Sequence, residues 1–96
     1  MTVEWDPSKD LQNRRKHGVS FEEAQELFLS GSEYLEIFDS LHSEEEDRFL
    51  AIGPTAQGIM VVVWTEREPE AIRIISARLA TEREQSLYHL YMERHR

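Results

Sequence analysis

The sequence contains no cysteine, and this absence excludes several classes of protein at once. A disulfide framework, a thiolate zinc site and a cysteine nucleophile all require a thiol. No hydrophobic run approaches the roughly 20 residues that a membrane-spanning helix requires. The first ten residues also lack the apolar segment of a signal peptide. We therefore expect a cytoplasmic protein with no membrane association.

Glycine and proline are scarce, with four and three residues, and no glycine-rich loop is present that could cradle a phosphate. His42 is followed by Glu44, Glu45 and Glu46, a combination that could suggest a metal site. Consecutive acidic residues in one loop rarely converge on a single ion, so we expect no metal site and no cofactor. A chain of 96 residues is large enough for one domain, which we expect to span residues 1–96.

Basic residues are outnumbered, with 11 Lys and Arg against 19 Asp and Glu, which gives a net charge of −8. This balance disfavours a broad interface with nucleic acid. The excess of negative charge is local, however, because residues 30–47 contain seven acidic and no basic side chains. Residues 48–80 contain four basic and three acidic ones. The sequence therefore allows a compact site for one phosphate. The acidic segment fits a solvated loop or a docking surface for a basic partner.

Capping signals predict three helices, at residues 7–17, 21–29 and 81–94. An Asp-Pro pair at residues 6 and 7 is typical of a helix start, and Gly18 is typical of a helix end. Ser20 with Glu23 and Thr81 with Glu84 have the spacing of capping boxes.

Runs of β-branched and aromatic residues predict strands at residues 3–5, 34–38, 48–53, 61–65 and 72–77. The resulting order is β-α-α-β-β-β-β-α, and the short loops between the later strands favour an antiparallel meander. We expect an α+β fold with a single twisted antiparallel sheet, helices on one face and the other face partly open. In an alternative arrangement the C-terminal helix projects away from the body.

The hairpin formed by the last two strands carries Arg67, Arg73 and Arg78, and Arg48 lies on the strand before it. Strand arginines are often solvated, but forked guanidinium donors also match phosphate oxygens. If Arg67 opposes Ile72, it shares a face with Arg78, and Arg73 lies on the other face. A register shifted by one residue places Arg67 with Arg73 and removes Arg78. The sequence does not decide between these registers.

The first predicted helix presents a polar face that contains Lys9, Asn13 and either Lys16 or His17. This face fits a solvated surface. It equally fits a lysine and a histidine that are presented to an anionic substrate.

Taken together, three segments resemble the BrnT family of toxins from type II toxin–antitoxin systems: EWDPSKDLQNRRKHGVSFEEA, DSLHSEEEDRFLAIG and VVVWTEREPEAIRIISARLATEREQSLY. They cover about two thirds of the chain, and the combination of KHGVSFEEA with RIISARLAT is specific. The resemblance implies a RelE-like ribonuclease fold and metal-independent cleavage of an RNA substrate. It also implies a ribbon-helix-helix antitoxin partner, BrnA, through which alone the pair binds DNA.

Such cleavage needs a group that accepts the 2′-hydroxyl proton and cationic donors for the phosphate. We assign the phosphate donors to Arg48, Arg67, Arg73 and Arg78, although Arg78 could instead tether the last helix. Proton transfer is assigned to Lys16 or His17, because an unperturbed histidine pKa lies near 6.5.

Three further residues, Trp5, Lys9 and Asn13, match family positions and are predicted to contact the substrate. Trp5 could stack a base or pack in the core.

Two departures from the family pattern keep a second hypothesis open. Leu79 stands where many relatives carry a basic residue, and the middle segment is unusually acidic. Fewer cations weaken RNA binding. The alternative function is a non-catalytic module that binds an antitoxin and modulates operon repression.

Overall fold

The computed structural model describes residues 1–95 and confirms the predicted order of elements. The elements are β1 (Thr2–Glu4), α1 (Pro7–His17), α2 (Phe21–Leu29), β2 (Leu35–Phe38), the short 3-10 helix η1 (Ser40–His42), β3 (Arg48–Thr55), β4 (Gly58–Arg67), β5 (Ala71–Leu79) and α3 (Glu82–Arg94). No helix within residues 1–95 is long and apolar enough to cross a membrane.

The helix ends lie where the capping signals predicted them. The Asp6 carboxylate accepts a hydrogen bond from the Ser8 backbone N–H and begins α1, which ends at Gly18 with a left-handed φ of 75°. Both capping boxes are formed, one at the start of α2 and one at the start of α3. These local bonds satisfy backbone donors that a helix leaves unpaired at its N-terminus.

The five strands form one sheet in the order β1-β5-β4-β3-β2. Strands β2 to β5 are antiparallel neighbours, as predicted. The prediction was wrong for β1, which pairs in parallel with β5 and makes the sheet mixed. Short connections determine the direction of the other four strands, whereas β1 and β5 are far apart in sequence, so no turn constrains their relative direction.

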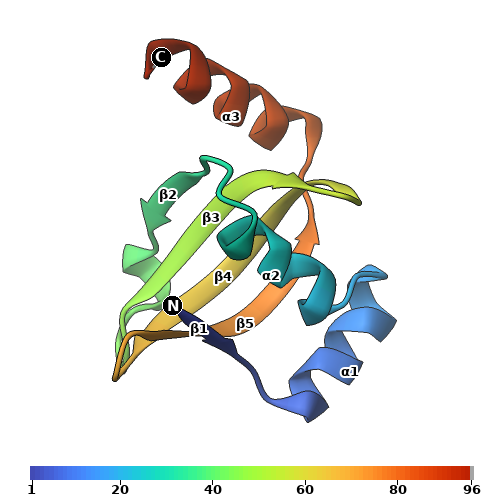
Figure 1. Cartoon of the computed structure of the whole chain (residues 1–96), viewed down its shortest axis with the longest axis vertical. Helices are drawn as coiled ribbons and strands as arrows, with labels where there is room; N and C mark the ends of the chain where they lie inside the picture. The colour runs from blue at the N-terminus through green and yellow to red at the C-terminus, as the bar shows by residue number, and fades with distance from the viewer. Residues whose placement is uncertain (96) are drawn as a thin grey trace.

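The main core lies between α2 and one face of the sheet, which we call the α2 face (Figure 1). Phe21, Ala24 and Leu27 of α2 are buried against residues of the central strands, including Val62 and Ile74. Burying each large apolar side chain contributes about 1.5–3 kcal/mol. This packing makes the central strands a rigid base for the side chains on both faces.

The other face of the sheet, which we call the open face, is only partly covered. α3 packs over one end of it through Tyr88 and Met92, against Ile52 and Val61. Figure 1 shows α3 lying apart from α1 and α2, beyond the end of the sheet. The C-terminal helix therefore projects, as in the alternative arrangement, yet it remains packed on the sheet.

Candidate functional site

A β-bulge in the β4–β5 hairpin places three arginines on the open face. Near the turn, Arg67 opposes Ala71 and Thr65 opposes Arg73. Beyond an irregularity at Val63 and Trp64, Val61 opposes Arg78. The extra residue in β5 shifts the alternation by one position. The first predicted register was therefore wrong, and the second holds only near the turn, because the bulge returns Arg78 to the face of Arg67 and Arg73.

These arginines have different surroundings. Arg78 forms a two-pronged ion pair with Glu84, with N–O distances of 2.7 and 2.8 Å. The hydrogen bond from Arg78 holds the pKa of Glu84 well below its usual range, at about 2, and the same bond raises the pKa of Arg78. Because Glu84 belongs to the first turn of α3, this geometry favours the predicted alternative role of Arg78 as a tether.

The other two arginines of the hairpin also contact carboxylates, at longer distances. An Arg67 nitrogen lies 3.3 Å from a Glu46 carboxylate oxygen in the loop before β3, and an Arg73 nitrogen lies 3.6 Å from a carboxylate oxygen of Glu4 in β1. Such partly exposed pairs contribute about 0–1 kcal/mol each. They are weak enough for a phosphate to replace them.

Asn13 fixes α1 against the edge of β5. Its side-chain amide donates to the Ala77 carbonyl at 2.8 Å and to the Val19 carbonyl at 3.0 Å, and its oxygen accepts from the Ala77 N–H at 3.0 Å. The amide thus satisfies edge groups of β5 that a further strand would otherwise pair with. Asn13 is buried, so its polar atoms position the helix and are already occupied.

We call these hydrogen bonds of Asn13 the clamp. The clamp brings the polar side of α1 beside the open face and creates a hollow of about 340 Å³. We call it the cationic hollow, and its lining consists of Lys9, Gln12, Asn13, Lys16, His17, Arg48, Ile75 and Ser76. Helix and strand thus bring together four of the predicted cationic or titratable residues. Gln12 and Ser76 were missed, although Gln12 lies three residues after Lys9 on the same side of the helix.

Arg48 is the strand residue that connects this hollow to the rest of the open face. It opposes Thr65, which in turn opposes Arg73, so the three form one row across β3, β4 and β5. The Nε atoms of Arg48 and Arg73 are buried and have no hydrogen-bond partner within residues 1–95. Arg48 also forms no ion pair there. Unpaired buried donors are costly, and an anion would satisfy them.

Trp5 does not line the cationic hollow. Its ring packs edge-on against Phe21, with the centroids 6.3 Å apart, beside the main core. This position favours the packing role over base stacking.

The acidic loop, residues 39–47, lies next to Arg48 on its other side. Arg48 lines a second hollow with Leu41, His42, Glu44, Glu45 and Glu46. The Nδ1 atom of His42 lies 3.0 Å from the Asp39 carboxylate. No group of three metal-ligating side chains converges anywhere in residues 1–95. The loop therefore brings negative charge close to the cationic hollow.

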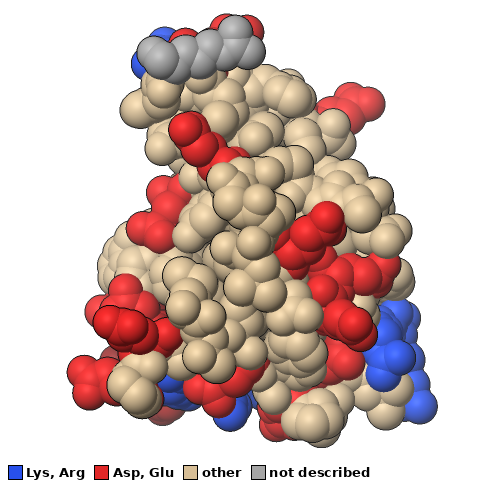
Figure 2. All heavy atoms as spheres, viewed as in Figure 1, with Lys and Arg blue, Asp and Glu red and all other residues tan. Residues whose placement is uncertain are grey.

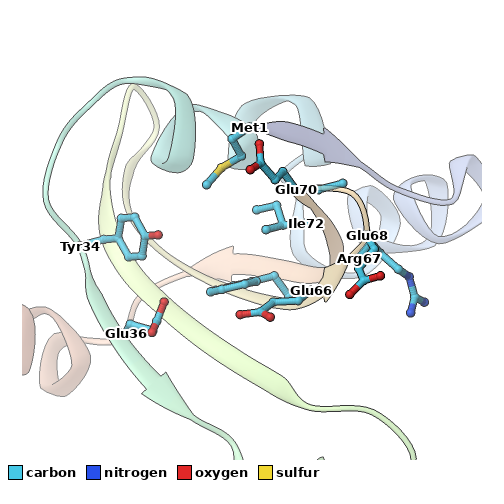
Figure 3. Close-up of a pocket in the computed structure, with 10 residues that line it drawn as sticks. Met1, Tyr34, Glu36, Glu66, Arg67, Glu68, Glu70 and Ile72 are labelled. Carbon is cyan, nitrogen blue, oxygen red and sulfur yellow. The ribbon is translucent and has the colours of Figure 1, made fainter.

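A third cavity, larger than these two hollows, lies elsewhere and was missed by sequence reasoning. It measures about 740 Å³, and we call it the acidic cavity, lined by Met1, Tyr34, Glu36, Trp64, Glu66, Arg67, Glu68, Glu70, Ala71 and Ile72 (Figure 3). Its four carboxylates would repel a phosphate. Size alone therefore does not identify the site for RNA chemistry.

Figure 2 shows how the charges are distributed on the α2 side of the molecule. Carboxylates occupy much of this surface, Lys and Arg gather over α1 at the lower right, and basic and acidic side chains are mixed along the bottom edge. The net charge of −8 therefore does not exclude a local group of basic side chains over α1.

The chain is similar to a known protein family and to a solved structure. Residues 5–84 match the family described as the ribonuclease toxin BrnT of type II toxin–antitoxin systems. A crystal structure of the Brucella abortus ribonuclease toxin BrnT has 30% sequence identity and a TM-score of 0.65, covering 85% of this chain and 99% of that chain. No curated protein matches. The chain therefore belongs to the BrnT family of ribonuclease toxins from type II toxin–antitoxin systems.

Proposed function

We propose that this chain cleaves RNA in the cationic hollow without a metal ion. The 2′-oxygen of a ribose forms a bond to the adjacent phosphorus and loses its proton to a side chain of the protein. The bond from phosphorus to the 5′-oxygen breaks, and that oxygen receives a proton. The protein then needs cationic donors for the phosphate and groups that transfer protons, both of which line the hollow.

The observation that supports this proposal most strongly is Arg48, whose buried Nε lacks a partner within residues 1–95 and whose side chain lines a hollow with Lys9, Lys16 and His17. A phosphate would satisfy that donor and neutralise the surrounding cations. Arg73, in the same cross-strand row, supplies a second donor once its weak contact with Glu4 is replaced.

Proton transfer is assigned to His17 or Lys16, which end α1 and line the same hollow. Lys9 contributes positive charge for the RNA backbone. Asn13 acts as a positioning residue, because its polar atoms bind Val19 and Ala77. Arg67 and Arg78 contribute less, because neither lines the hollow or belongs to the cross-strand row of Arg48. Arg78 is also held by Glu84 at 2.7 and 2.8 Å.

The partner in this proposal is a BrnA-like antitoxin of the ribbon-helix-helix class. Support comes from the family, whose members belong to type II toxin–antitoxin systems. The antitoxin neutralises the ribonuclease, and the pair contacts DNA only through the antitoxin.

The test is incubation of the purified chain with a long single-stranded RNA in the presence of EDTA. We expect cleavage by the wild type and a loss of at least about 100-fold in the Lys16→Ala/His17→Ala double variant, because general acid–base groups contribute factors of this size. Arg15→Ala is the control, since Arg15 is exposed on the same helix and does not line the hollow.

Equal cleavage by the double variant and the control would contradict the assignment of proton transfer. If no form cleaved RNA and expression did not arrest growth, while the chain still co-purified with its antitoxin, the non-catalytic binding module would be the correct function. The acidic composition supports that second candidate.

A further inference from the structure

The acidic cavity has no role in the proposed cleavage and lies mainly on the α2 face of the sheet, with Arg67 and Ala71 lining it beside the β4–β5 turn. Along β4 and β5, the side chains of Trp64, Glu66 and Ile72 point to the α2 face. Those of the neighbouring residues Thr65, Arg67 and Arg73 point to the open face. Trp64 and Ile72 belong to the main core of the α2 face. A ligand in this cavity would therefore not compete directly for the cationic hollow.

The lining combines aromatic and apolar surface with carboxylates. Tyr34 provides the more accessible ring, Trp64 and Ile72 are each only 6% exposed, and Met1, which is 72% exposed, lies at one side. Burial raises the pKa of the Tyr34 phenol, and the nearby Glu36 carboxylate raises it further. The Tyr34 phenol is therefore neutral and offers an O–H donor and an aromatic ring at neutral pH.

Carboxylates surround this apolar surface. Figure 3 shows Glu36 and Glu66 on one side of the cavity and Glu70 on the other, beside Met1. The guanidinium of Arg67 points away from the cavity, in agreement with its contact with Glu46. Glu36 and Glu66 are exposed and form no ion pair within residues 1–95, so their charges are available to a ligand.

This combination selects one kind of side chain. A guanidinium is planar, is weakly hydrated for a cation, stacks on aromatic rings and donates in pairs to carboxylates. A phosphate or an acidic peptide would be repelled, and a purely apolar group would leave the carboxylates without partners. The volume of about 740 Å³ also lies within the range of small-ligand pockets, which suits an arginine together with part of its neighbouring residues.

We propose that the acidic cavity receives an arginine side chain of the antitoxin and so forms an anchor of the toxin–antitoxin interface. The existence of a protein partner follows from the family, and the arginine follows from the charge and aromatic lining of the cavity. The proposal rests on membership of the toxin–antitoxin family and is independent of RNA cleavage.

The first test is a titration of the ¹⁵N-labelled chain with the peptide acetyl-Gly-Arg-Gly-amide, observed through the indole N–H signal of Trp64. The Trp5 indole, which packs on Phe21 outside the cavity, is the internal reference. We expect a saturable shift at Trp64 and none at Trp5. The matching citrulline peptide, which keeps the shape and lacks the charge, should bind at least about fivefold more weakly.

The variant that tests the site is Glu36→Gln/Glu66→Gln, which removes two exposed carboxylates beside the aromatic surface. We expect its affinity for the arginine peptide to fall by at least about fivefold. Glu44→Gln/Glu45→Gln is the matched control, because it removes the same charge from the acidic loop. That control should change the affinity by less than about twofold.

The outcomes separate a built site from general attraction to an acidic protein. An equal loss in both double variants, equal binding of the citrulline peptide, or no saturable shift at Trp64 would overturn the proposal. In the purified toxin–antitoxin complex, Glu36→Gln/Glu66→Gln should also speed dissociation by about fivefold or more. An unchanged dissociation rate would overturn the assignment of the arginine to the antitoxin. None of these measurements involves RNA, so their failure is distinct from a failure of the proposed cleavage.

Discussion

The cationic hollow and the acidic cavity lie on opposite faces of one sheet and share strands β4 and β5. Thr65 and Glu66 are neighbours in sequence, yet Thr65 belongs to the row that contains Arg48 and Arg73, whereas Glu66 lines the acidic cavity. Strand alternation thus separates charges that composition averages. A net charge of −8 therefore describes neither site.

The two regions also differ in how they are assembled. The cationic hollow depends on one helix being held against a strand edge by Asn13. The acidic cavity is formed by strand side chains and the β4–β5 turn, beside the main core. Removing the clamp should therefore damage the first region and spare the second.

Asn13→Ala tests the strength of this clamp and should have the largest effect on stability. The substitution removes three buried hydrogen bonds and leaves the Ala77 N–H and carbonyl without partners. We expect a loss of about 3 kcal/mol in the free energy of unfolding, measured by urea denaturation. Gln12→Ala, at the preceding residue of the same helix, should change the free energy of unfolding by less than about 0.5 kcal/mol. A loss below about 1 kcal/mol for Asn13→Ala would contradict the clamp.

The Arg78–Glu84 pair is on the open face but belongs to neither region, so its removal should affect stability and leave RNA cleavage unchanged. Glu84→Gln is expected to cost about 1 kcal/mol at neutral pH, because the pair is partly exposed. The pKa of Glu84 is lowered from 4.5 to about 2 in the folded chain. The contribution of ionised Glu84 to the free energy of unfolding is therefore present above pH 4.5 and is lost as the pH falls toward 2.

Urea denaturation of the wild type and Glu84→Gln at neutral and acidic pH measures this pH dependence. The difference between the two proteins should shrink as the pH falls. A difference that is unchanged at low pH would mean that the charge of Glu84 is not what anchors α3.

The acidic loop is expected to produce the smallest effect, because it lies beside the cationic hollow without lining it. Glu44→Gln/Glu45→Gln removes negative charge near Arg48 and should tighten RNA binding about twofold to threefold at low ionic strength. Fluorescence anisotropy with a labelled RNA measures this, and the gain should diminish at physiological salt. Weaker binding by this variant would show that the loop itself contacts RNA.

Local signals made the elements predictable, and long-range pairing determined what was missed. Capping boxes and Gly18 gave the helix bounds, because these contacts lie within a few residues. The bulge at Val63 and Trp64 has no such signal, although it decides which face Arg78 occupies. The Asn13 contact with Ala77 spans 64 residues and was equally hidden.

The site was predicted only in part, because some of its residues are related by local spacing and others only by long-range packing. Lys9, Lys16 and His17 are related by helix periodicity, so their common side could be read from the sequence. Their approach to Arg48 depends on the order of three strands and on the clamp. The acidic cavity combines residues from the N-terminus, β2, β4 and β5, and no single segment indicates it.

The most direct test compares RNA cleavage by Arg48→Gln with cleavage by Glu36→Gln/Glu66→Gln, both in EDTA. We expect a loss of at least about 100-fold for Arg48→Gln, the size expected when a phosphate donor is removed. We also expect a change of less than about twofold for the double variant, whose side chains lie across the sheet. Unchanged cleavage by Arg48→Gln, or an equal loss in both proteins, would contradict the assignment of RNA chemistry to the cationic hollow.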